Sequence, residues 1–200
     1  MEPIAQNDVI EKLRAGMNWD QKVDLEDGGA TVGPGIVFQT EPVELKIDAD
    51  DYLIFDGDMA EIVMAYDDAC LEGMISVHKH MFPRSSNMTK RDVESMFNPY
   101  VKRPMLKKVS IPIVDDLLAQ GDQGDDMSRE DFVKRVREGG VRAELIVELA
   151  GFAVDAHMFT PIVAVSEAAL CPPEPPPKRK PRLTRKSPIA PVAINVSEKK

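Results

Sequence analysis

Five aspartates lie in the stretch DADDYLIFDGD, residues 48–58, and clustered carboxylates are the side chains that hard divalent cations prefer. A calcium loop of the EF-hand type beginning at Asp48 would need glycine at its sixth position and glutamate at its twelfth, where Leu53 and Met59 stand. A two-metal phosphoryl-transfer site would require the fold to bring five carboxylates together: Asp48, Asp51, Asp56, Asp58 and Glu61. We favour a strand flanked by solvated turns, with Asp58 as a helix cap. A metal-dependent enzyme using the Asp48–Asp58 cluster is kept as an alternative.

Histidine and cysteine side chains offer a second possible metal site. His78, His80, His157 and Cys70 are ligand types that zinc accepts, but their spacing matches no zinc motif. The two cysteines, Cys70 and Cys171, lie far apart and in no paired motif, so we expect two reduced thiols. No catalytic triad elbow and no dinucleotide-binding glycine pattern is present. The sequence therefore names no reaction, and we expect a protein that is not an enzyme and has no cofactor.

The segment CPPEPPPKRKPRLTRK, residues 171–186, is the strongest indication of a binding function. Five prolines between residues 172 and 177 forbid regular helix and favour an extended polyproline II spacer. A basic cluster follows the spacer, and the apolar sequence VAINV follows the cluster like a short strand or peptide anchor. We predict that the following residues contact a partner: Lys178, Arg179, Lys180, Arg182, Arg185, Lys186, Ile189, Val192, Ile194 and Val196.

Charge is distributed unevenly along the 200 residues. Residues 171–200 hold eight Lys or Arg residues against two acidic residues, a net charge of +6, whereas the whole chain carries −9. Residues 1–170 therefore carry −15. An acidic body repels nucleic acid and anionic membranes at long range, while a basic arm is attracted to acidic surfaces. One such surface is the acidic body itself, on the same copy or on a neighbouring one.

Hydrophobic periodicity predicts an α+β fold with a small antiparallel sheet over about residues 35–55, packed by several short helices. The sequence VELKID alternates, with Val43, Leu45 and Ile47 on one face, and the apolar runs GIVFQT and YLIF flank it. Residues 109–120 are ambiguous and fit a strand followed by a helical turn, and residues 161–170 fit a strand or a short helix.

Helices are predicted where apolar residues recur every three to four positions. The segments are residues 7–17 with Asn7 as cap, 58–77 with Asp58 and Glu61 as a capping box, a short helix after Thr89, a helix from Ser128 to Gly139, and residues 141–158.

Targeting and membrane signals are also predicted to be absent. No apolar run approaches the roughly 18 residues of a membrane-spanning helix. The N-terminal residues lack the basic start and apolar middle of a signal peptide, so we expect the protein to be made inside a cell and to make no membrane contact.

These observations predict a non-enzymatic structural or interaction protein. Residues 1–170 would form an acidic globular body, and residues 171–200 a Pro-rich basic arm that reaches a neighbouring subunit of a larger assembly, such as sister copies or other subunits in a virion. One alternative is a nucleic-acid-associated accessory protein that uses the arm as its contact. The other alternative is the metal-dependent enzyme described above.

Overall fold

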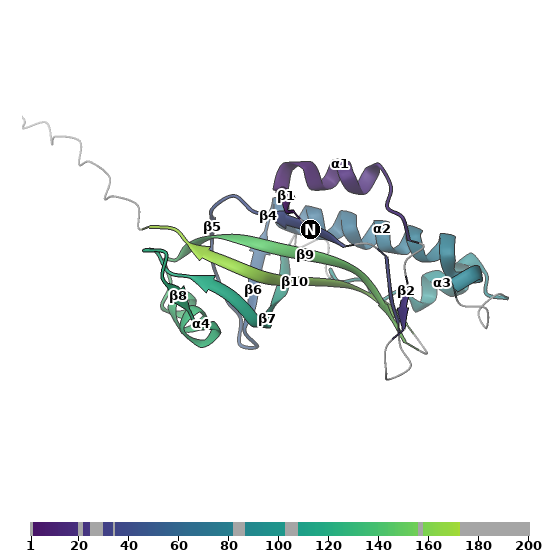
Figure 1. Cartoon of the computed structure of the whole chain (residues 1–200). Coiled ribbons are helices and arrows are strands. Elements are labelled where there is room, and N and C mark those ends of the chain that lie inside the picture. The colour runs from purple at the N-terminus through teal and green to yellow at the C-terminus, as the bar shows by residue number, and fades with distance from the viewer. Residues whose placement is uncertain are drawn as a thin grey trace, which may run out of the picture.

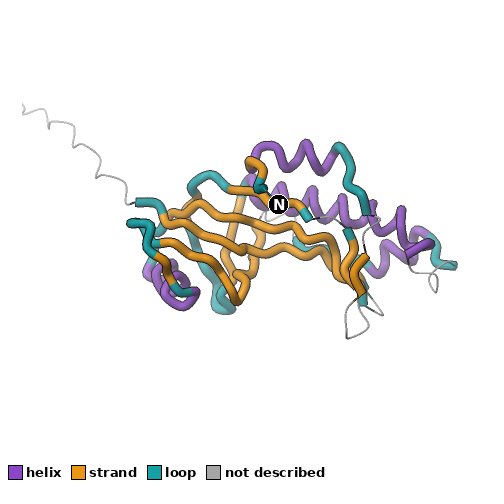
Figure 2. The backbone as a smooth tube through the Cα atoms, viewed as in Figure 1, coloured by secondary structure: helices purple, strands orange, loops and turns teal. Residues whose placement is uncertain are grey.

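The structure, a computed structural model, describes residues 2–19, 22–24, 30–33, 35–81, 87–102, 108–155 and 158–172. These residues form a mixed sheet together with helices. The strands are β1 (Ile4–Ala5), β2 (Lys22–Asp24), β3 (Ala30–Val32), β4 (Ile36–Gln39), β5 (Val43–Glu44), β6 (Tyr52–Asp56), β7 (Lys108–Gln120), β8 (Asp126–Met127), β9 (Arg142–Val154) and β10 (Phe159–Leu170). The helices are α1 (Val9–Arg14), α2 (Asp58–Met81), α3 (Lys90–Met96) and α4 (Arg129–Glu138). The α+β class is as predicted (Figures 1 and 2).

The sheet is large, and the prediction of a small antiparallel sheet over residues 35–55 is wrong. Its main strands run in the order β1-β4-β9-β10-β7-β6, and the long strands β7, β9 and β10 form its middle. Strands β9 and β10 are antiparallel, whereas β10 and β7 are parallel. Strands β4 and β6 do form where predicted, but β4 pairs with β9 and β6 pairs with β7. An isolated bridge between Ile47 and Leu53 links the segments that were predicted to pair with one another.

The helix predicted over residues 141–158 is also wrong, because most of this segment is the central strand β9. Its side chains alternate between a core face with Leu145, Val147 and Leu149 and a second face that is partly exposed. Residues 109–120 and 161–170, which the pattern left undecided, are strands β7 and β10.

Three of the predicted helices form at the expected places. Helix α3 begins after Thr89, whose side chain accepts from the Asp92 backbone N–H in a capping box. Ser128 caps α4 by accepting a hydrogen bond from the Asp131 backbone N–H. Helix α2 begins at Asp58, so this residue lies in the first turn instead of preceding it. The N-terminal helix is shorter than predicted, since a 3-10 turn over Gln6–Asp8 takes in Asn7 before α1 begins.

One continuous hydrophobic core lies between the helices and one face of the sheet. Helices α2 and α4 contribute their apolar sides to it, for example Tyr66 and Phe132, and the inward residues of β7, β9 and β10 complete it. The opposite face of β9 and β10 is turned toward the viewer in Figures 1 and 2. None of the described helices has the length and apolar character needed to cross a bilayer.

Aromatic rings join the distant parts of this core. Trp19 contacts Phe152 with 5.3 Å between ring centroids, Phe152 lies 5.6 Å from Phe159, and Phe159 lies 5.1 Å from Phe97. Phe152 on β9 is therefore the ring through which Trp19 of the N-terminal segment is connected to Phe159 and Phe97.

A second core contact fixes an irregularity in β9. Gly151 adopts φ +82°, and the buried Tyr66 hydroxyl on α2 donates a 2.6 Å hydrogen bond to its carbonyl oxygen. Burial raises the pKa of Tyr66 well above its ordinary value, so the hydroxyl keeps its proton and remains a donor.

A buried carboxylate anchors the segment that follows α3. Asp67 of α2 accepts hydrogen bonds from the backbone N–H groups of Tyr100 and Val101, both at 2.9 Å. Burial raises the pKa of this carboxyl, and the two backbone hydrogen bonds oppose that shift. Since both oxygens are occupied by backbone donors, Asp67 is a structural residue.

Candidate interaction surface

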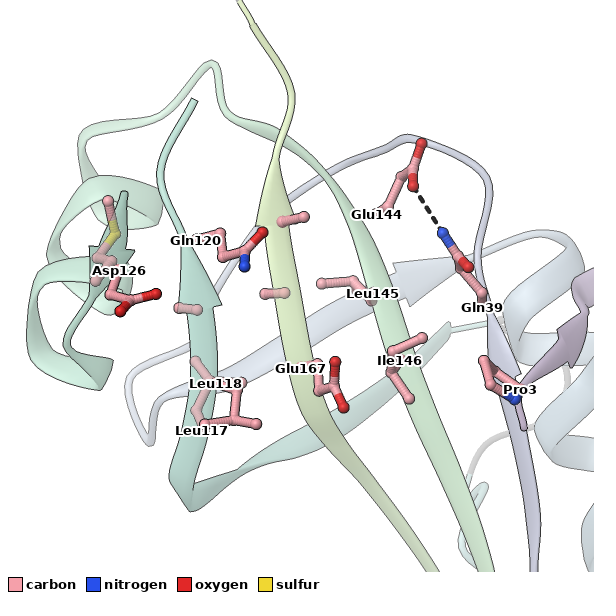
Figure 3. Close-up of a pocket in the computed structure, with 14 residues that line it drawn as sticks. Pro3, Gln39, Leu117, Leu118, Gln120, Asp126, Glu144, Leu145, Ile146 and Glu167 are labelled. Atoms are coloured by element: carbon pink, nitrogen blue, oxygen red, sulfur yellow. Dashed lines mark hydrogen bonds between the residues drawn. The ribbon is translucent and has the colours of Figure 1, made fainter. Parts of the chain in front are cut away.

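A groove of about 680 Å³ lies on the partly exposed face of the sheet, where β4, β9, β10, β7 and β8 run side by side (Figure 3). Its position follows from strand register, because residues paired across neighbouring strands point to the same face. Two adjacent cross-strand rows form most of its floor.

The first row combines apolar and polar side chains. Strand pairing aligns Gln39 of β4 with Ile146 of β9, Ile146 with Glu167 of β10, and Glu167 with Leu118 of β7. Leu118 is 68% exposed, and Ile146 is partly exposed. The first row therefore presents exposed apolar surface on both sides of a carboxylate.

The second row lies two residues farther along the same strands. It aligns Glu144 of β9 with Ala169 of β10, Ala169 with Gln120 of β7, and Gln120 with Asp126 of β8. The Gln39 amide of the first row donates a 2.7 Å hydrogen bond to Glu144, drawn as a dashed line in Figure 3.

The charged side chains that line the groove, among the described residues, are all acidic. Three carboxylates line it, those of Asp126, Glu144 and Glu167, and the described residues contribute no Lys or Arg to its lining. Figure 3 shows these carboxylates spread across the strands, from Asp126 on β8 to Glu144 on β9, which faces Gln39 of β4. A surface that combines apolar floor residues with carboxylates is chemically complementary to an extended basic segment.

The C-terminal arm begins beside this groove. Ala169 lies in the groove, Leu170 ends β10, and the Cys171 N–H donates a 2.8 Å hydrogen bond to the Arg142 carbonyl oxygen at the start of β9. The predicted partner-binding residues of the arm lie outside the described residues: Lys178, Arg179, Lys180, Arg182, Arg185, Lys186, Ile189, Val192, Ile194 and Val196.

Two of the five aspartates of residues 48–58 have side-chain partners in the described structure. Asp48 Oδ1 accepts hydrogen bonds from the backbone N–H groups of Asp50 and Tyr52, at 3.0 and 2.9 Å. Asp51, at φ 63°, pairs with Arg137 of α4 at 2.6 Å. Within the described part of the chain, no three or more His, Cys, Asp or Glu side chains are grouped as a metal would require.

The histidine and cysteine candidates are not brought together either. Cys70 and His78 are both buried on α2, but their separation of eight residues corresponds to about 12 Å along a helix. His78 Nδ1 lies 2.9 Å from the Ile75 carbonyl oxygen, and burial raises the pKa of the Cys70 thiol. The side chain of His80 and all of His157 lie outside the described residues.

Sequence reasoning missed every residue of the groove. The alternation Arg142, Glu144, Ile146, Glu148 is the signal that would have found the β9 contribution, because it marks a strand with one partly exposed face.

Comparisons with known proteins give no family for this chain. No family model matches the sequence, and no curated protein is significantly similar to it.

Proposed function

We propose that this chain is a non-enzymatic subunit of a larger assembly, such as a virion, in which the acidic body docks and the basic arm reaches a neighbouring subunit. The observation that carries the proposal is the opposition of charge between the two parts of the chain. Residues 171–200 carry +6 and residues 1–170 carry −15, so neighbouring copies attract one another when the arm of one meets the body of the next.

The groove supports this proposal because it is an acidic surface that also exposes apolar side chains. Interfaces that last need buried apolar contact as well as charge complementarity. Leu118 and Ile146 provide the apolar surface. The carboxylates of Asp126, Glu144 and Glu167 provide the charge that complements a basic segment.

Parallel titrations with protein and with nucleic acid test the proposal. Fluorescently labelled full-length protein would be titrated with unlabelled protein, duplex DNA and single-stranded RNA, with anisotropy as the readout at low and moderate salt. We expect binding to unlabelled protein that weakens with salt and is lost when all six basic residues of 178–186 are changed to glutamine.

Nucleic-acid binding has its own signature in the same titration. Its affinity falls with a log–log salt slope of about −0.9 for each phosphate contacted on duplex DNA. Tight nucleic-acid binding with such a slope, together with no binding to unlabelled protein, would contradict the assembly function and favour the accessory-protein alternative.

A further inference from the structure

We propose that the groove lined by Asp126, Glu144 and Glu167 is the receptor for the basic segment 178–186 of a second copy of this chain. The proposal rests on the assembly function proposed above and names the surface through which neighbouring copies would join. Each copy would present one groove and donate one arm.

Complementary chemistry is the first argument for this occupant. The segment KRKPRLTRK carries six basic side chains, and the groove offers three carboxylates with no Lys or Arg among its described lining residues. The segment also contains Leu183, and Leu118 and Ile146, which flank Glu167 on its two sides, provide apolar surface for such a side chain. The basic side chains of the segment thus match the carboxylates of the groove, and its leucine matches the apolar side chains of the floor.

The second argument is the openness of this sheet face. Helices α2 and α4 pack on the core face, so the floor residues of the groove keep their side chains accessible. Leu118, at 68% exposed, would bury most of its side chain if an extended segment lay across β7 and β10. Burial of an exposed apolar side chain contributes favourable free energy that charge attraction alone does not supply.

The start and length of the spacer argue for a second copy over the same one. Lys178 follows Ala169, which is itself in the groove, by nine residues. Residues 172–177 contain five prolines, and six residues of polyproline II extend about 19 Å. A spacer that is extended, as its prolines predict, would carry the basic segment past the groove beside which its own arm begins, so we assign the segment to a neighbouring body. The resulting contact is head-to-tail and builds rings or open chains of subunits.

Mixing two defective full-length proteins tests the proposal. The groove variant carries Asp126→Asn, Glu144→Gln and Glu167→Gln, and the arm variant carries glutamine at all six basic positions of 178–186. Each variant alone is expected to self-associate at least about tenfold more weakly than the native chain, because three or more ion pairs are lost. When the two are mixed, the intact groove of one meets the intact arm of the other, and sedimentation velocity should show one-to-one pairs that grow no further.

A matched control separates groove chemistry from net charge. The variant Glu11→Gln, Asp68→Asn, Glu72→Gln removes the same three negative charges from exposed positions on α1 and α2, and it should self-associate within about twofold of the native chain. The variant Leu118→Ser tests the apolar part; its exposed position predicts unchanged stability with weaker association.

The outcomes distinguish this proposal from the assembly function. If the arm variant loses association while the groove variant keeps it, the groove is not the receptor and the assembly function stands. Mixtures that stay monomeric would also overturn the groove proposal, since a contact between copies must be restored by mixing. A native chain that stays monomeric at every concentration overturns the groove proposal as well, and the anisotropy titration above then decides the assembly function separately.

Discussion

Replacing Phe152 with alanine should lower the free energy of unfolding by about 3–5 kcal/mol, the range found when large core aromatics are truncated. Phe152 is fully buried and is the ring that contacts both Trp19 and Phe159. Its loss leaves a cavity between β9 and the N-terminal segment, and Trp19 loses its aromatic partner there. Urea denaturation followed by tryptophan fluorescence measures the change directly, because Trp19 is the single tryptophan of the chain.

The leucine variant provides the control for this prediction. Phe152→Leu keeps much of the buried volume but removes the ring contacts, so it should cost about 1–2 kcal/mol. Equal losses for alanine and leucine, or a loss below about 1 kcal/mol for alanine, would show that Phe152 does not join these parts of the core.

Replacing Gly151 with alanine is expected to be about as damaging, at about 3 kcal/mol or more. A Cβ at this position would lie 2.2 Å from the Val32 carbonyl oxygen and 3.2 Å from that of Gly33, and both are backbone atoms of the adjacent β3 segment. The positive φ of +82° adds strain for any L side chain. The backbone of β9 or β3 must therefore shift, which also disturbs the hydrogen bond from Tyr66 to the Gly151 carbonyl.

The variant Gly124→Ala separates the steric clash of an added Cβ from the strain of a positive φ. Gly124 has nearly the same φ, +81°, but a Cβ there would meet nothing within 4 Å. Gly124→Ala should therefore lose only the conformational part, about 1 kcal/mol. A Gly151→Ala protein as stable as Gly124→Ala would contradict the close approach of β9 and β3.

Local signals made the helices predictable. Helices α3 and α4 begin beside Thr89 and Ser128, whose hydroxyls satisfy backbone N–H groups that the first turn leaves free, and Gly139 ends α4. Such caps act within three or four residues, so a single sequence reveals them. Helix α2 was predictable for another reason. Its apolar residues recur every three to four positions over a segment long enough to identify a helix.

Strand β9 shows where local pattern fails. Leu145, Leu149 and Phe152 recur at spacings of four and three, which suits a helix, yet a spacing of four is also two steps of a strand. The neighbouring positions decide the matter, because Ala143 before Leu145 and Val147 between Leu145 and Leu149 complete the core face of a strand. An apolar run of this length is ambiguous until the partner strands are known.

The groove was hidden for a related reason. Its lining comes from β4, β7, β8, β9 and β10, and the residues meet only through register between strands far apart in sequence. No spacing along the chain shows that Leu118 stands beside Glu167. The charge of the arm was visible at once, whereas the acidic surface that complements it required the fold.

Light scattering after size exclusion, on the full chain and on residues 1–172 at low and moderate salt, would show whether the arm joins neighbouring copies. Ending at Pro172 retains the hydrogen bond from Cys171 to Arg142, and circular dichroism checks that the shortened chain is folded. We expect an oligomer for the full chain at low salt, smaller species at moderate salt, and a monomer for residues 1–172. An oligomer that survives removal of residues 173–200 would contradict the claim that the arm joins neighbouring copies.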